Sequence, residues 1–153
     1  MIEINRSLEI AASPERVWQV LSHANEYDLQ GGETREQVTS AQEEGVGVTL
    51  RVERKVGPLK LTLEGRMTEW QVARRMASEW NSGFPFFIST SVDMSLILNG
   101  AGTRLLRVYG FRIGLPFIGA LGERWLSPNT ARDMDNLMQR IKQASESQAL
   151  PRA

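Results

Sequence analysis

Four charged residues stand where strand alternation places apolar side chains, and they are the residues of this sequence best suited to chemistry. They are Arg6, Arg54, Glu69 and Arg107. A charge that leaves water without a partner is costly, so such a residue is paired, meets solvent at a strand end, or faces a cavity with water or ligand. Contact with solvent suits Arg54 and Glu69, near strand ends. Arg6 and Arg107 lie in mid-strand, where an inward arginine predicts a ligand with an anionic or carbonyl-bearing head.

The sequence does not supply the residue sets that most catalytic sites need. It contains no cysteine and one histidine, His23, which we expect at the end of a short helix, where a cation suits the helix dipole. No Ser–His–acid arrangement, metal-ligand cluster or phosphate-binding loop can be assembled from it. We therefore predict no catalytic residues, no metal and no cofactor.

Charge and composition argue against several classes of protein. The 18 basic and 18 acidic residues balance, whereas nucleic-acid binders carry a basic surplus that neutralises phosphates, so we expect no nucleic-acid partner. The longest apolar stretches are short and broken by glycine, as in Ile113–Leu121, which is too short to span a bilayer. The absence of cysteine suits a reducing compartment. With no signal-like segment at residues 1–6, these features predict a cytoplasmic protein.

The chain begins with a predicted strand and a short predicted helix. Apolar and polar residues alternate over residues 2–10, as in a half-buried strand. The segment Ser13-Pro14-Glu15 supplies an N-cap, a proline suited to the first helical position and an acid suited to the helix dipole. A helix is therefore predicted from there to about Ser22, and residues 24–29 are expected to add a turn or two.

Strand patterns follow one another over residues 33–113. They predict strands at 34–42, 46–56, 60–69, 73–81, 85–98 and 102–112. Connections this short join antiparallel neighbours, because parallel strands need long crossovers. The expected topology is therefore an antiparallel meander.

After Gly114 the apolar residues recur at helical spacing as far as Ile141, which predicts one long C-terminal helix. Pro128 falls inside this segment and either kinks the helix or splits it in two. In this interpretation residues 1–146 form one ligand-binding domain, and residues 147–153 form a flexible tail.

These elements predict an α+β fold. A seven-stranded curved antiparallel sheet around the long C-terminal helix, with one or two short helices after the first strand, buries the apolar faces of both sheet and helix. A curved sheet cannot touch a rod along its whole width. The arrangement therefore leaves space between sheet and helix, where small-molecule sites occur.

Three segments carry a resemblance to a known family, the helix-grip superfamily. They resemble its opening strand-to-helix junction, its third-strand entry and the turn into its last strand, and they are Leu8-Glu9-Ile10-Ala11-Ala12-Ser13-Pro14-Glu15-Arg16-Val17-Trp18, Gly45-Val46-Gly47 and Gly102-Thr103-Arg104-Leu105. Over residues 2–145 the chain is similar to START lipid-transfer domains, birch-pollen-allergen-like proteins and, most of all, bacterial polyketide cyclase/dehydrase-like proteins. The resemblance implies a cavity for a hydrophobic ligand and no universal catalytic residues.

Strand alternation and helix periodicity predict the residues that face this cavity. Two phases compete over 102–112, and we prefer the bulkier one, which holds Arg107 and Tyr109. Over 74–80 we prefer the phase of Met76 and Trp80. The predicted ligand-binding residues are Arg6, Leu50, Val52, Leu63, Met67, Trp80, Phe86, Ile88, Thr90, Val92, Met94, Arg107, Tyr109, Phe117, Leu121 and Trp125.

These features predict a protein that binds or carries a small hydrophobic molecule, lipid-like or aromatic. One alternative is a polyketide cyclase/dehydratase-type enzyme whose candidate proton-handling groups are Arg6, Glu69, Arg107 and Tyr109. A second alternative is an interaction protein whose Phe111–Leu121 surface, partly exposed, contacts a membrane or a protein partner. An inward arginine near a tyrosine or glutamate favours the enzyme, whereas a purely apolar cavity favours the carrier. The oligomeric state is left open.

Overall fold

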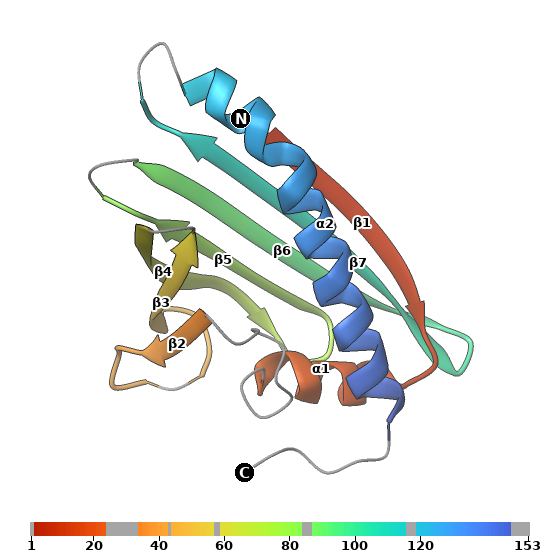
Figure 1. Cartoon of the computed structure of the whole chain (residues 1–153). Coiled ribbons are helices and arrows are strands. Elements are labelled where there is room, and N and C mark those ends of the chain that lie inside the picture. The colour runs from red at the N-terminus through yellow and green to blue at the C-terminus, as the bar shows by residue number, and fades with distance from the viewer. Residues whose placement is uncertain are drawn as a thin grey trace.

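The computed structural model describes residues 2–23, 34–42, 44–56, 59–83, 87–115 and 119–147. Its elements follow the predicted order and confirm the α+β fold with a curved antiparallel sheet and a C-terminal helix (Figure 1). They are β1 (Ile2–Ile10), α1 (Pro14–Ser22), β2 (Thr34–Val38), β3 (Thr49–Val56), β4 (Leu59–Gln71), β5 (Arg75–Asn81), β6 (Ile88–Asn99), β7 (Gly102–Ile113) and α2 (Gly119–Glu146). The further helical turn predicted at 24–29 lies outside the described residues, and so does the predicted tail apart from Ser147.

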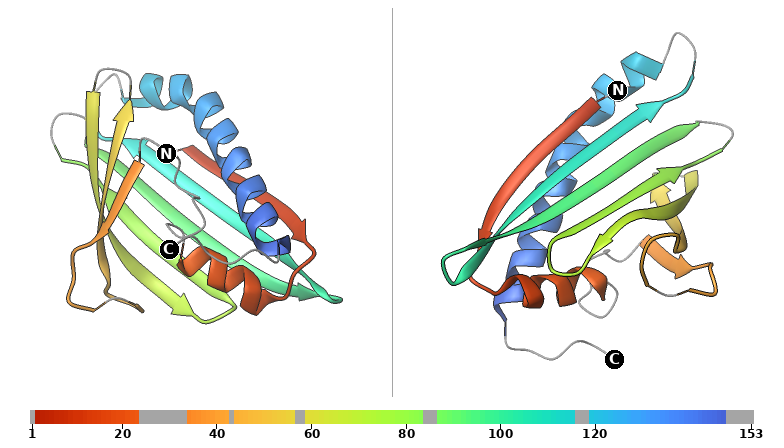
Figure 2. Two further views of the ribbon diagram at one scale, coloured as in Figure 1. Left: turned by 60° about the horizontal axis from the view of Figure 1, so that its bottom comes forward. Right: turned by 180° about the vertical axis from the view of Figure 1, so that it is seen from behind.

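The seven strands form one antiparallel sheet in the order β1-β7-β6-β5-β4-β3-β2. Six of the strands, β2 to β7, follow one another as a meander, and the first strand of the chain joins at the far edge by pairing with the last. This pairing sets Arg6 directly opposite Arg107. Both views in Figure 2 show the sheet curving around α2, which lies across its concave side.

A β-bulge in β4 corrects one predicted phase. The register shifts between Met67 and Glu69, so that Met67 pairs with Ser78 while Glu69 pairs with Ala77. The extra residue turns Trp70 to the inner side in place of Glu69. Trp70 packs edge-on against Trp18 with ring centroids 5.1 Å apart. Glu69 accepts a hydrogen bond from Gln71 Nε2 at 3.3 Å and does not line the cavity.

Helix α1 begins as the sequence predicts. The Ser13 hydroxyl accepts a hydrogen bond from the Arg16 backbone N–H at 3.3 Å, and Pro14 occupies the first turn. The apolar face of the helix is buried and consists of Val17, Trp18, Val20 and Leu21. With Ile10, Leu105 and Ile141, this face forms the dense part of the core, where α1 and α2 meet the sheet.

Helix α2 runs without a break from Gly119 to Glu146 and contains Pro128. The proline therefore does not split the helix, and Figure 2 (left) shows the helix bending in its N-terminal part. A bend is expected, because a proline removes one backbone hydrogen bond and its ring clashes with the preceding turn. Among the described elements α2 contacts β1, β7 and α1. Helix α1 contacts β6 and β7, so it is α2 that leaves the inner faces of β3 to β6 uncovered.

The C-terminal end of α2 is held by three side chains, which we call the C-terminal clamp: Arg16, Lys142 and Glu146. Arg16 donates to the backbone carbonyls of Ala144, Ser145 and Ser147 at 3.3, 3.4 and 2.9 Å. These contacts satisfy carbonyls that have no partner within the helix. Lys142 Nζ donates to Glu146 at 2.7 Å and to the Glu9 carbonyl at 3.1 Å.

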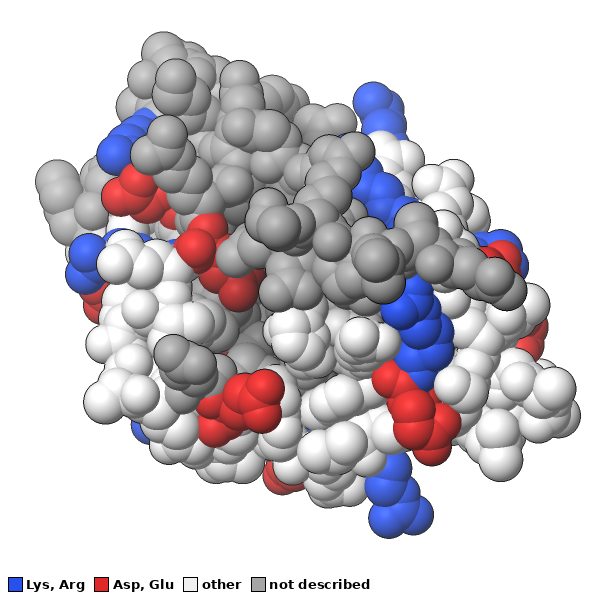
Figure 3. All heavy atoms as spheres, turned by 90° about the horizontal axis from the view of Figure 1, so that it is seen from below, with Lys and Arg blue, Asp and Glu red and all other residues white. Residues whose placement is uncertain are grey.

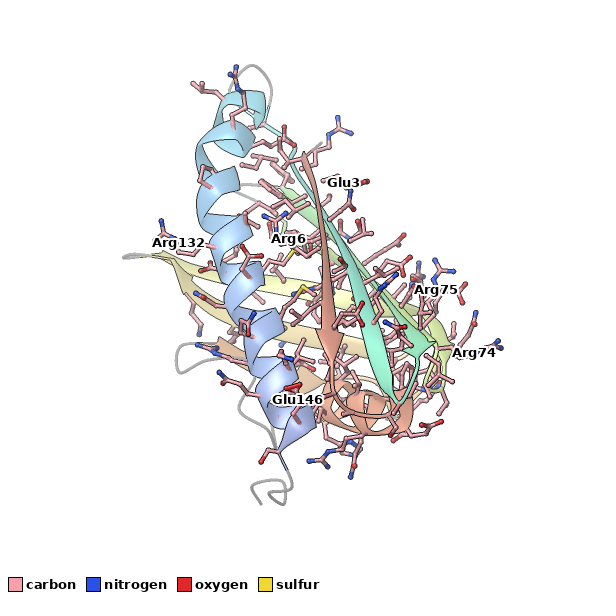
Figure 4. All side chains as sticks on the ribbon, turned by 90° about the vertical axis from the view of Figure 1, so that its right-hand side faces the viewer. Glu3, Arg6, Arg74, Arg75, Arg132 and Glu146 are labelled. Carbon is pink, nitrogen blue, oxygen red and sulfur yellow. The ribbon has the colours of Figure 1, made fainter. Side chains whose placement is uncertain are left out.

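Glu146 joins the end of α2 to the junction between β1 and α1. Its carboxylate also accepts a hydrogen bond from the Ala11 backbone N–H at 3.0 Å. Figure 4 shows Glu146 at the end of α2 beside this junction. The hydrogen bond from Lys142, and then the one from Ala11, lower the pKa of Glu146 below its ordinary value.

The clamp predicts a dependence of stability on pH. A carboxyl group whose pKa is lower in the folded state stabilises that state above its ordinary pKa of 4.5, and this stabilisation is lost as the pH falls through the lower, folded-state value. We expect Tm to fall on acidification below about pH 4.5, and Glu146→Gln to lower Tm at pH 7 and make the acid dependence shallower.

The matched control is Glu3→Gln on β1, because the Glu3 carboxylate makes no hydrogen bond or ion pair to another residue within the described part of the chain. Differential scanning fluorimetry across the pH range gives the measurement. Identical acid profiles for Glu146→Gln and the wild type would show that the clamp carboxylate does not act in this way.

Candidate ligand-binding cavity

A cavity of about 240 Å³ lies between the concave face of the sheet and the two helices. Most of its wall is apolar, and its lining residues are Leu21, Glu36, Leu50, Val52, Leu63, Met67, Met76, Ser78, Trp80, Thr90, Val92, Met94, Arg107, Tyr109, Leu137 and Ile141. A cavity of ~150 Å³ holds benzene, and drug-sized ligands occupy about 300–1,000 Å³. The space therefore fits a medium-length chain or a molecule of one or two rings.

The cavity brings together ten of the predicted ligand-binding residues: Leu50, Val52, Leu63, Met67, Trp80, Thr90, Val92, Met94, Arg107 and Tyr109. Burial also confirms the preferred phase of β7, because Leu105 and Phe111 are buried whereas Val108 is exposed. That these residues bind a ligand stays a prediction.

The structure places three predicted residues away from the cavity. Arg6 lies on the side of β1 that faces α2 (Figure 4), and its Nε is 2.7 Å from Asp135 Oδ1. Ile88 begins β6 opposite Ile113, beyond the lined region. Leu121 lies in the first turns of α2 with 69% of its surface exposed, because these turns place Gly119 and Glu123, and not Leu121, against the end of β7.

Three further predicted residues cannot be placed against the cavity. Phe86 and Phe117 lie outside the described residues, and Trp125 belongs to α2 without a described side chain. The predicted interaction surface is changed as well. Phe111, expected to be partly exposed, is buried, with 4% of its surface exposed. Of the rest of that surface, 116–118 lie outside the described residues.

Sequence reasoning missed six lining residues: Leu21, Glu36, Met76, Ser78, Leu137 and Ile141. Helical spacing marked Leu137 and Ile141 as apolar, but it does not show which turn of a long helix lies over the cavity. Ser78 shares the inward phase of Met76 and Trp80, so alternation was sufficient to find it. Glu36 lies in a short polar strand in which alternation gives no signal.

Arg107 is the unusual residue of this wall. It is 9% exposed, and among the described residues no group accepts a hydrogen bond from its Nε. Its guanidinium carbon lies 5.8 Å from the centre of the Tyr109 ring, a cation–π distance. Burial lowers the pKa of Arg107 to about 10, against a smaller opposing effect of Tyr109. The structure therefore holds a cation in a largely apolar space.

The register of β1 with β7 explains why this cation lacks an acid. Arg6 and Arg107 are direct neighbours across the strand pair, where like charges repel. Asp135 on α2 pairs with Arg6. Within the described residues Glu36 is the single carboxyl side chain that lines the cavity, and it comes from β2, five strand positions away from β7.

Two further polar features shape the wall. Burial raises the pKa of Glu36 above its ordinary value of 4.5, so its acid form persists to higher pH. Trp80 Nε1 donates to Ser78 Oγ at 2.8 Å, which fixes the indole against the sheet. The ring lies over Gly65 on β4, where an added Cβ atom would be only 2.3 Å from Trp80 Cε3. A glycine at this position is therefore what admits the indole to the wall.

The described residues contain no group of three side chains able to hold a metal ion. They also contain no helix that is both long and apolar enough to cross a bilayer. On the face seen in Figure 3, basic and acidic side chains are interspersed, without the continuous basic surface that a phosphate backbone requires. The absence of metal, cofactor and nucleic-acid partners stays a prediction.

A sheet that curves around a C-terminal helix and encloses a cavity defines the class of helix-grip proteins. Solved structures share this fold. The protein TTHA0849 from Thermus thermophilus is 17% identical with a TM-score of 0.75, and the match covers 94% of this chain and 97% of that one. CV1439 from Chromobacterium violaceum is 15% identical, with a TM-score of 0.70 over 95% of this chain and 97% of its own. Ara h 8.0201 is 8% identical, with a TM-score of 0.70 over 94% and 97%.

The family of the chain follows from its sequence. The profile of the family described as polyketide cyclase/dehydrase and lipid transport matches residues 1–146, and the chain belongs to this family. The predicted resemblance to bacterial polyketide cyclase/dehydrase-like proteins is thereby confirmed. No curated protein matches the sequence.

The buried arginine predicts a gain in stability when it is removed. An uncompensated buried charge costs several kcal/mol, so Arg107→Met, which keeps the length and apolar stem, should raise the free energy of unfolding of the ligand-free protein by about 1–4 kcal/mol. The matched control is Arg6→Met on the facing strand. Its partly exposed pair with Asp135 should change stability by at most about 1 kcal/mol.

Urea denaturation of delipidated protein measures both variants. A loss of stability in Arg107→Met larger than that in Arg6→Met would mean that the guanidinium is compensated within the protein.

Proposed function

We propose that the protein binds and carries a small, largely apolar molecule in the cavity. The observation that carries this proposal is the wall itself, in which Leu, Val, Met and Trp side chains from strands β3 to β6 face a space of about 240 Å³. Empty apolar space of this size forfeits packing energy, so a protein retains it where a ligand fills it. The description of the family, which includes lipid transport, supports the same conclusion.

The chemistry of the wall sets the expected affinity. Burial of apolar surface contributes about 25 cal/mol per Å², so a ligand that buries roughly 250 Å² gains about 6 kcal/mol before the costs of association. The methionines, among them Met67, Met76 and Met94, adapt to different ligand shapes. Because about 6 kcal/mol corresponds to a Kd of roughly 40 μM before those costs, these contacts alone are expected to give a Kd of about 0.1 mM or weaker. A cytoplasmic carrier is in keeping with the cysteine-free sequence.

A second candidate function is favoured by a specific observation. The cavity is not purely apolar: Arg107 lies beside Tyr109, and Glu36, whose pKa is raised by burial, faces the same space. A carboxyl group with a raised pKa suits general acid–base work, and an arginine suits an enolate or carbonyl oxygen. These groups support a cyclase/dehydratase-type enzyme. Arg6 and Glu69, the other two candidates for proton handling, point elsewhere.

Filling the cavity tests the binding proposal. We expect native mass spectrometry of freshly purified protein to show a retained small molecule, or decanoate or naphthalene to raise Tm. Val92→Phe on the inner face of β6 should lower the affinity for these ligands at least about tenfold, because the added ring occupies the ligand's space. The matched control is Val108→Phe on the outer face of β7, where Val108 is exposed. Equal binding by both variants would exclude the cavity as the site.

A turnover assay of the wild type and of Glu36→Gln distinguishes the carrier function from the enzyme function. If the protein catalyses cyclisation, the wild type should convert a linear poly-β-ketoacyl thioester to a cyclic product detected by liquid chromatography and mass spectrometry. Glu36→Gln should then lower the rate about 10²–10⁴-fold, because an amide cannot transfer the proton. Ligand affinity, measured by intrinsic tryptophan fluorescence to which Trp80 in the cavity wall contributes, should stay within a few-fold. An inactive wild type that binds the thioester leaves the carrier as the function.

A further inference from the structure

An apolar ligand alone does not account for Arg107. A neutral lipid or hydrocarbon would leave the guanidinium buried with its Nε lacking an acceptor among the described residues. Arginine offers five N–H donors and no acceptor, and its charge persists at neutral pH. A carrier of neutral molecules would be more stable with a methionine or leucine here. A ligand that brings an acceptor would complete this site.

Within the described part of the chain, no acidic side chain serves as the partner of Arg107. Asp135 accepts a hydrogen bond from Arg6 Nε at 2.7 Å, and Asp93, on the outer side of the sheet, accepts hydrogen bonds from Arg75 Nε and Nη2 at 3.1 and 2.6 Å. Glu36, the carboxyl group that shares the cavity, is separated from Arg107 by five strand-to-strand steps of about 4.8 Å along the sheet. Burial raises the pKa of Glu36, whereas a guanidinium close by would lower it.

We propose that the ligand is an amphipathic monocarboxylate, whose carboxylate binds the Arg107 guanidinium and whose apolar body lies against the wall from Val92 to Leu63. This inference rests on the proposed binding function and specifies its ligand. A carboxylate presents two oxygens that match the fork of the guanidinium, and such charge-assisted pairs are among the strongest in proteins. A carbonyl oxygen alone would leave the charge uncompensated.

The position of Arg107 sets the orientation of the ligand. Arg107 on β7 is 9% exposed, whereas Glu36 on β2 is half-buried, and buried and half-buried residues both occur along the wall between them. The carboxylate therefore lies against β7, and the apolar tail points along the wall toward β2. Glu36 at that end disfavours a second carboxylate, so the ligand carries one anionic group.

Matched probes test this assignment. Decanoate, decanol and methyl decanoate share a chain and differ in the head, while decanedioate adds a second carboxylate. We expect the wild type to bind decanoate at least about tenfold more tightly than decanol or methyl decanoate, and more tightly than decanedioate. In Arg107→Met the preference for decanoate over the neutral probes should vanish while the neutral probes still bind. Arg6→Met should keep the full preference.

A spectroscopic readout separates a direct contact from a structural role of the arginine. Decanoate labelled with ¹³C at its carboxyl carbon should keep the chemical shift of the ionised form in the wild-type complex at pH values where unbound decanoate is protonated. Since Glu36 also faces the cavity and titrates, Glu36→Gln repeats the titration with that group removed. The ¹³C shift of the ionised form should be kept in Glu36→Gln and lost in Arg107→Met.

The outcomes distinguish the two proposals. Equal affinity of the wild type for decanoate and decanol, or a bound carboxyl group that titrates as in water, overturns the carboxylate assignment and leaves the carrier function standing. If none of the probes, nor naphthoate as an aromatic monocarboxylate, binds the wild type, the carrier function itself fails. Preference for decanoate that survives in Arg107→Met places the anion elsewhere and also overturns the assignment.

Discussion

The shape of the cavity depends on the contacts that hold α2 at one edge of the sheet. Arg16, Lys142 and Glu146 bind its last turn to the β1–α1 junction, and its apolar face packs against β1 and β7. A helix held along one edge of a curved sheet diverges from the opposite edge. The inner faces of β3 to β6 are therefore not covered by α2, and the cavity is a geometric consequence of the way α2 is held.

The same placement of α2 determines which of two neighbouring arginines has an acidic partner. Arg6 and Arg107 are register partners and are chemically alike, but α2 passes over β1 and presents Asp135 to Arg6. Arg107, one strand further into the sheet, faces the space that the helix leaves open. Pairing one of two adjacent cations removes part of their repulsion and leaves the other buried without an acid in the described chain. The placement of α2 thus leaves both the space open and the Arg107 charge within it unpaired.

The sequence was sufficient for the fold and for about half of the site, for identifiable reasons. Alternation predicts which side of a strand faces inward, so Leu50, Met67 and Val92 were found. It fails where the register slips, as at the bulge that exchanges Glu69 for Trp70. It also cannot separate Arg6 from Arg107, because the distinction depends on Asp135, which is distant in sequence. Glu36 carried no signal, since its strand is short and polar.

Arg107 and Glu36 bear on the choice between carrier and enzyme through their separation. Acid–base catalysis on one bond needs its groups within hydrogen-bond reach of the same reacting atoms. These two groups enter the cavity from β7 and β2, at opposite sides of an apolar wall. A ligand that extended along the wall would meet one of these groups at each end, which favours the proposed carrier over a single reacting centre. In the proposed complex, the carboxylate offsets the stability that the buried cation costs, so affinity would depend on the head group more than on the chain.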